Sequence, residues 1–107
     1  MTSFDDRKNA FETKFALDEE LRFRAMARRN KLLGLWAAER LGKSGPEAEA
    51  YARSVVAADF EEAGDGDVLR KVRGDLEAAG ANQSEAQIRR VMDELMARAM
   101  QEIRTES

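Results

Sequence analysis

Apolar residues recur every three or four positions along most of this chain, and short turn sequences interrupt the pattern at three places. The recurrence predicts four helices, at about residues 19–41, 46–62, 66–79 and 84–104. Gly42 and Gly80 stand where glycine commonly ends a helix, and Pro46 stands at a first-turn position. Ser84 opens a capping-box sequence, Ser-Glu-Ala-Gln, at the start of the fourth helix.

Each predicted helix carries one apolar face. The residues expected to be buried are Leu21, Ala25, Leu32, Leu35 and Trp36 on the first helix, Ala48, Tyr51, Ala52, Val55, Val56 and Phe60 on the second, Val68, Leu69, Val72 and Leu76 on the third, and Ile88, Val91, Met92, Leu95, Ala99 and Ile103 on the fourth. Connections of only a few residues favour antiparallel neighbours. We therefore expect an all-α protein in which residues 18–107 form a four-helix bundle.

Residues 1–17 follow a different pattern. On a helix, Phe4, Phe11 and Phe15 would lie within about 40° of one another and form a narrow apolar stripe. The next positions on that line, near Asp18 and Arg22, are charged, so the stripe does not continue into the first bundle helix. A helix this short is marginal alone in water. We therefore expect a separate, mobile, helix-prone segment, which either docks on the bundle or binds in a groove of another protein.

The composition narrows the function. The chain has 107 residues, which suits one bundle domain, and it contains neither cysteine nor histidine. Disulfides, thiolate metal sites and Ser-His or Cys-His nucleophile pairs are therefore excluded, and we expect neither an enzyme nor a metal protein. No apolar run is long enough to span a bilayer and no secretion signal opens the chain, so we expect a cytoplasmic protein that does not insert into the membrane.

Basic residues concentrate in one part of an acidic chain. The net charge is −3, yet residues 21–43 hold seven basic side chains and one acidic. Five of the basic side chains form one run: Arg22, Arg24, Arg28, Arg29 and Lys31. They either form a solvated face that pairs with acidic residues of 44–107, or contact an acidic protein or the phosphates of weakly bound ATP or ADP. The overall acidity and the lack of a binding motif argue against nucleic acid.

Four stretches resemble the zeta subunit of alphaproteobacterial F-type ATP synthases: FDDR at 4–7, KFALDEELRFRA at 14–25, ARRNKLLGLWAAERLGK at 27–43 and VVAADFEEAGDGDVLRKVRGDL at 55–76. The resemblance implies a four-helix bundle whose N-terminal region becomes helical when it enters the catalytic head, between the large subunits and the central stalk. There it would block rotation in the direction of ATP hydrolysis. Such a protein would be peripheral to the inner membrane through the ATP synthase.

Carried over by position, the resemblance assigns eight residues to the inhibitory segment, with the bundle as its anchor: Phe4, Asp5, Asp6, Arg7, Lys8, Phe11, Lys14 and Phe15. Relatives within the family have a histidine where this chain has Leu17, so we expect no histidine-based pH switch. The chain lacks a heptad seam, and we expect a monomer when it is free.

Two other functions stay open from the residues alone. A nucleotide-binding helical bundle would use the face from Arg22 to Lys31. A general adaptor would present the N-terminal helix to a different protein.

Overall fold

The computed structural model describes residues 3–59 and 66–106, and for residues 3–18 it describes the backbone alone. These residues form four helices and no strands: α1 (Ser3–Arg40), α2 (Pro46–Ala58), α3 (Gly66–Ala78) and α4 (Glu85–Glu106). The predicted all-α, four-helix architecture is confirmed. Phe60, expected on the apolar face of the second helix, lies outside the described residues, and α2 ends at Ala58.

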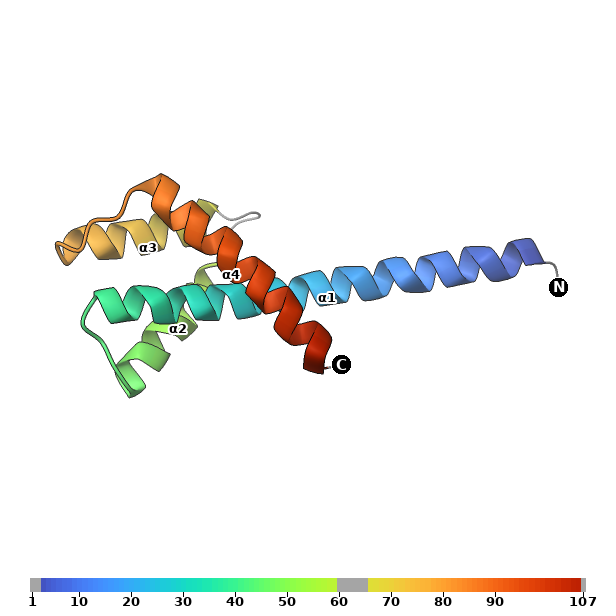
Figure 1. The fold of residues 1–107 in the computed structure, drawn as a ribbon, viewed down its shortest axis with the longest axis horizontal. Helices are drawn as coiled ribbons and strands as arrows, with labels where there is room; N and C mark the ends of the chain where they lie inside the picture. The colour runs from blue at the N-terminus through green and yellow to red at the C-terminus, as the bar shows by residue number, and fades with distance from the viewer. Residues whose placement is uncertain (1–2, 60–65, 107) are drawn as a thin grey trace.

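Helix α1 is the axis of the molecule. Its C-terminal half packs against α2, α3 and α4, whereas its N-terminal half projects away from them (Figure 1). The molecule measures 64 × 25 × 22 Å along its principal axes, and the projecting helix accounts for this elongation. We call residues 3–18 of α1 the projecting segment.

The projecting segment is helical, as expected, and it joins the bundle helix without a break. Helix α1 therefore begins at Ser3 rather than near residue 19, and Asp18 lies within it. Neither proline nor glycine occurs between Ser3 and Asn30, so no residue there stops a helix that the bundle has already nucleated. The mobility of this segment in the free protein stays a prediction.

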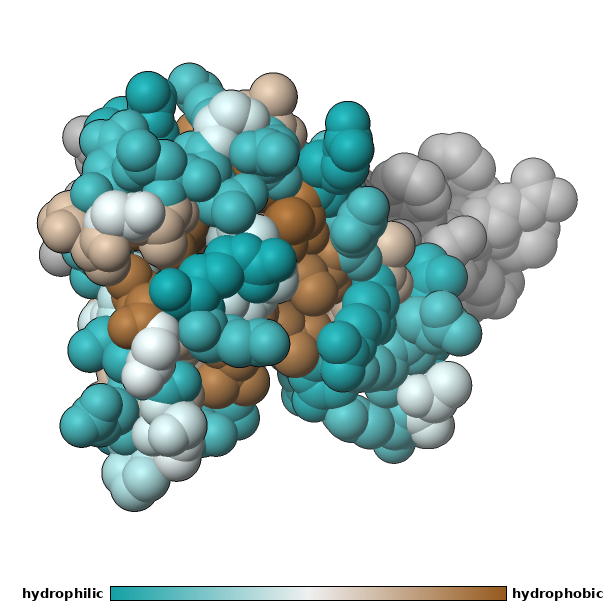
Figure 2. All heavy atoms as spheres, turned by 60° about the vertical axis from the view of Figure 1, so that its left-hand side comes forward, coloured by the Kyte–Doolittle hydropathy of each residue, from teal (hydrophilic) through white to brown (hydrophobic). Residues whose placement is uncertain are grey.

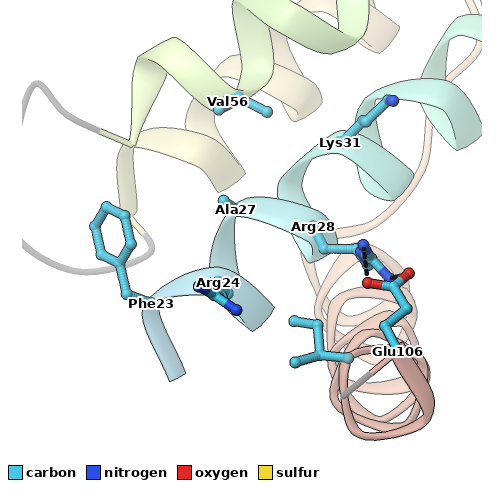
Figure 3. A pocket seen from close by; sticks show the side chains of 8 residues that line it. Phe23, Arg24, Ala27, Arg28, Lys31, Val56 and Glu106 are labelled. Carbon is cyan, nitrogen blue, oxygen red and sulfur yellow. Dashed lines mark hydrogen bonds and ion pairs between the residues drawn. The ribbon is translucent and has the colours of Figure 1, made fainter. Parts of the chain in front are cut away.

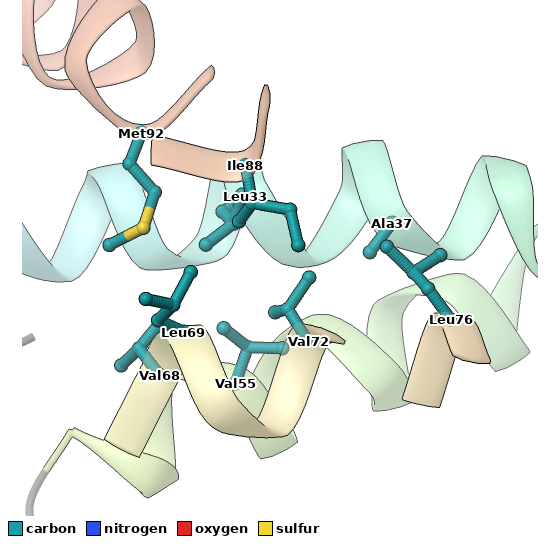
Figure 4. Packing of buried hydrophobic residues seen from close by; sticks show 9 residues of the cluster. All are labelled: Leu33, Ala37, Val55, Val68, Leu69, Val72, Leu76, Ile88 and Met92. Carbon is teal, nitrogen blue, oxygen red and sulfur yellow. The ribbon is translucent and has the colours of Figure 1, made fainter. Parts of the chain in front are cut away.

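The main hydrophobic core lies between the C-terminal half of α1 and the three shorter helices (Figure 4). Its buried members are Leu33, Ala37, Val55, Val68, Leu69, Val72, Leu76, Ile88 and Met92. A second cluster joins Ala25 of α1 to Ala99 and Ile103 near the end of α4. The predicted apolar faces of α3 and α4 are confirmed, because their central residues are buried and Val91 and Leu95 are partly buried.

The buried face of α1 differs in part from the predicted one. Ala25 is buried as expected, but Leu33, Ala37 and Ala38 are fully buried, whereas Leu32 and Trp36 are only partly buried. Leu35 is also only partly buried. Because α1 contacts all three other helices, its buried arc is set by where these neighbours lie and not by its largest side chains alone.

Helices α1 and α2 approach each other closely at Gly34. A Cβ atom at that position would lie 2.6 Å from the Cα atom of Ala52 and 3.3 Å from a methyl group of Val55. Glycine is therefore required at this crossing, because the missing side chain makes room for the backbone of α2.

The ends of the helices follow the sequence signals. The backbone N–H of Ser84 donates to Gln87 Oε1 at 2.9 Å, and the backbone N–H of Gln87 donates to Ser84 Oγ at 3.1 Å, so the capping box is confirmed. Gly42 and Gly80 both have positive φ, at 75° and 73°, and end α1 and α3. The short connections that follow return the chain onto the bundle.

A polar contact links α2 to α3 beside the core. The Tyr51 hydroxyl donates to Asp75 Oδ2 at 2.8 Å, and Lys71 Nζ donates to the same oxygen at 3.1 Å. Burial and this hydrogen bond raise the pKa of Tyr51 well above its usual value of 10.0. Tyr51 is therefore a neutral hydrogen-bond donor, and the contact holds α3 in register with α2.

Candidate functional site

The projecting segment contains all eight residues that the sequence assigns to the inhibitory region. At 1.5 Å per residue, residues 3–18 span about 24 Å beyond the bundle. The side chains of Phe4, Asp5, Asp6, Arg7, Lys8, Phe11, Lys14 and Phe15 lie outside the described residues. The backbone there is helical, which is the conformation that places Phe4, Phe11 and Phe15 on one face.

The five residues of the basic run lie on α1 where it enters the bundle, and the structure separates them. Arg22, Arg24 and Lys31 are exposed, Arg28 is partly buried, and Arg29 is 5% exposed. Arg22 lines a hollow with Met100 and Arg104, whereas the other exposed members line a different groove. The five side chains therefore do not converge on one phosphate-sized site.

Arg28 binds the last turns of α4. Its Nη1 and Nη2 atoms donate to the two carboxylate oxygens of Glu106, at 2.6 and 2.9 Å, and Nη1 lies 3.6 Å from Glu102. The hydrogen bonding between the two side chains raises the pKa of Arg28 and lowers the pKa of Glu106. This contact joins the root of the projecting segment to the C-terminal helix.

Arg29 and Asn30 form a buried polar pair inside the bundle. The Nε and Nη2 atoms of Arg29 donate to Asn30 Oδ1 at 3.0 and 2.8 Å. Asn30 is fully buried, and its amide nitrogen makes no hydrogen bond within the part of the chain that the structure describes. Arg29 is thus part of the packing between helices, although the sequence suggested an exposed binding residue.

A groove with a volume of about 740 Å³ lies beside the Arg28–Glu106 pair (Figure 3). Three helices line it: α1 with Phe23, Arg24, Ala27, Arg28 and Lys31, α2 with Val56, and α4 with Ile103 and Glu106. Phe23 stands at one side of the groove and the ion pair at the other (Figure 3). We call it the root groove, because it lies where α1 leaves the bundle.

Phe23 is the one large hydrophobic residue that the structure exposes among the described side chains, with 61% of its surface accessible. The face shown in Figure 2 is mostly hydrophilic, and hydrophobic side chains are visible in the hollows between helices. Sequence reasoning missed the root groove because its wall comes from three helices. The one local signal was Phe23 itself, an aromatic residue inside a basic run.

Two kinds of site are absent from the described part of the chain. Its carboxylates form no cluster of three or more that could hold a metal ion. None of its helices combines the length and the apolar character that crossing a membrane requires.

Comparison with known proteins identifies the family. A family model described as ATPase inhibitor subunit zeta matches residues 1–102. A protein with a solution NMR structure is 55% identical in sequence and superposes with a TM-score of 0.72, over 81% of this chain and 99% of that chain. A comparison with curated proteins gave no significant match. Because the family model covers both the projecting segment and nearly all of the bundle, this chain belongs to the ATPase inhibitor subunit zeta family.

Proposed function

We propose that this protein inhibits ATP hydrolysis by the F-type ATP synthase by inserting the projecting segment into the catalytic head. The segment enters between the large subunits and the central stalk and blocks rotation, while the bundle stays outside as an anchor. The family match supports the inhibition of an ATPase by an inhibitor subunit without catalytic activity of its own. The observation that carries the insertion is the continuity of α1 from the bundle core to the tip of the projecting segment.

Continuity of the helix lowers the cost of insertion. A separate peptide of this length would have to nucleate a helix, which is unfavourable, whereas here each residue extends a helix that the core already holds. The ordering cost on binding is therefore reduced to that of fixing side chains and the frayed end. A helix fixed in the bundle also transmits a load, which a wedge against a rotating stalk requires.

The side chains of the segment supply the affinity in this proposal. Burying Phe4, Phe11 and Phe15 would contribute about 1.5–3 kcal/mol each, before ordering costs. Arg7, Lys8 and Lys14 would fix the orientation by pairing with carboxylates of the partner. A helix-in-groove complex of this kind explains why large apolar rings are kept on a segment that projects from its own core.

The partners in this proposal are the catalytic head and the central stalk. The protein would act as a monomer on the cytoplasmic face of the inner membrane, held there through the ATP synthase, without nucleic acid and without a tightly bound cofactor. Weak binding of ATP or ADP stays a prediction; Arg24, Arg28 and Lys31 line the root groove, whereas Arg22 lines a different hollow.

The test compares two double variants of the full chain on a catalytic head that lacks this subunit. Phe11→Ala with Phe15→Ala removes two rings, and Asn9→Ala with Thr13→Ala is the matched control, because those residues lie about 140–180° from Phe4 on the helix. We expect the phenylalanine variant to need at least about tenfold more protein for half-inhibition of ATP hydrolysis. Equal inhibition by both variants would refute the insertion.

A further inference from the structure

The root groove is open to a partner other than this chain's own N-terminus. Helix α1 runs unbroken past the groove, with Phe23 and Lys31 in its middle and residues 3–18 leading away from the bundle. The projecting segment could reach the groove only by breaking α1. The projecting segment is therefore not the occupant.

The chemistry of the groove favours an occupant with both apolar and acidic groups. Ala27, Val56 and Ile103 supply an apolar surface, next to the exposed ring of Phe23. Aromatic residues are the usual anchors of protein interfaces, where they pack against apolar surface from which binding expels water.

The charge at the rim is positive. Glu106 is the acidic residue of the lining, and Arg28 binds it through two hydrogen bonds. Of the other two charged residues, Arg24 pairs with Glu20 of its own helix at 2.8 Å, and Lys31 forms no ion pair with any described residue, so the lining keeps an excess of positive charge. Since the whole chain carries a net charge of −3, a local cationic rim marks a surface that attracts an acidic partner.

We infer that the root groove is a second docking surface, which binds an acidic segment with apolar side chains on the catalytic head, beside the place where the projecting segment enters. This inference rests on the proposed function. Phe23 lies eight positions after Phe15, which is about 12 Å along the helix. A partner that holds the end of the projecting segment therefore lies within reach of the groove.

Two contacts on one rigid helix reinforce each other. Once the groove is docked, the projecting segment is held near its own site at a high effective concentration, and insertion becomes an intramolecular step. The groove then determines how much protein is needed for inhibition. The projecting segment determines how complete the inhibition is.

The experiment uses the full chain and a purified catalytic head with its central stalk but without this subunit. Phe23→Ala removes the anchor and Lys31→Glu reverses a rim charge, and both side chains are exposed and lie outside the two buried clusters. Arg90→Glu is the charge-matched control, because Arg90 is an exposed residue of α4 that does not line the groove. Each variant is measured for its half-inhibitory concentration, its maximal inhibition and its direct binding to the immobilised head.

We expect Phe23→Ala to raise the half-inhibitory concentration at least about tenfold, with maximal inhibition unchanged at saturation. Lys31→Glu should raise it about three- to tenfold at low salt, with a smaller effect at high salt. Arg90→Glu should stay within about twofold of the unchanged protein. Binding and half-inhibition that are unaltered by both groove variants would overturn the inference.

The two proposals fail separately. If the phenylalanine variant of the projecting segment inhibits fully, the insertion is refuted, and the direct binding of Phe23→Ala still decides the groove. A photo-crosslinking amino acid in place of Phe23 identifies the occupant. We expect an adduct with a segment of the head that contains acidic and apolar residues. An adduct between two copies of this chain, an adduct with a segment lacking acidic residues, or none at all would overturn the inference.

Discussion

Replacing Gly34 by alanine tests the packing that holds α1 against α2. The added Cβ atom would lie 2.6 Å from the Cα atom of Ala52, whereas carbon atoms in contact are normally about 3.5–4.0 Å apart. The obstacle is backbone, which cannot rotate away as a side chain can. The two helices must therefore separate by about 1 Å where they cross.

The magnitude follows from two opposing effects. Overpacking in a close-packed core costs about 1–3 kcal/mol, and alanine in a helix is favoured over glycine by about 1 kcal/mol. Because the clash at Gly34 is with backbone, we expect the upper part of the overpacking range. The net loss in the free energy of unfolding is then about 1–2 kcal/mol, which for a domain of this size lowers the melting temperature by about 4–8 °C or more.

Gly74 provides the matched control for this substitution. It lies inside α3, it is exposed, and a Cβ atom there would have nothing within 4 Å. Gly74→Ala should therefore raise the free energy of unfolding by about 1 kcal/mol. Urea unfolding followed by circular dichroism measures both variants. If Gly34→Ala stabilises the protein as Gly74→Ala does, the close approach of α1 and α2 is refuted.

Four further predictions concern the N-terminal segment, the α2–α3 contact, the Arg28–Glu106 ion pair and the pH dependence of inhibition. Deleting residues 1–17 should abolish inhibition of ATP hydrolysis yet leave cooperative thermal unfolding, and loss of cooperativity would show that the segment belongs to the core. Tyr51→Phe removes the hydrogen bond to Asp75 and should lower the free energy of unfolding by about 1 kcal/mol, as measured in urea. Arg28 lowers the pKa of Glu106 in the folded state, so this pair stabilises the fold above the usual glutamate pKa of 4.5, and the contribution is lost as pH falls through the lower, folded pKa. Acid unfolding of Glu106→Gln should lack that part of the pH dependence, and an identical acid profile would contradict it. Inhibition itself should change little between about pH 6.5 and 8, because the chain has no histidine, and a tenfold change in half-inhibition would contradict this.

The sequence by itself determined the features that depend on neighbours along the chain. The helix stops at Gly42 and Gly80 and the capping box at Ser84 follow from interactions within a few residues. The apolar faces of α3 and α4 follow from the spacing of apolar residues along each helix. Helices α3 and α4 each present one face to the core. For such helices periodicity is enough to identify the buried residues.

Tertiary structure decided the length of α1. The interruption of the phenylalanine stripe near Asp18 suggested a boundary, but a change in which face is apolar does not break backbone hydrogen bonds. The bundle nucleates α1, and the helix then continues to Ser3 because no residue stops it.

Tertiary structure also decided which side of α1 is buried and where its charges go. Leu33 and Ala38 are buried in place of Leu32 and Trp36, and Arg29 lies inside the bundle although Lys31, two residues away, is exposed. A helix surrounded by three others has a buried arc fixed by their positions, which periodicity within one segment does not encode. The root groove has the same origin, since its lining is assembled only when the three helices that contribute to it pack together.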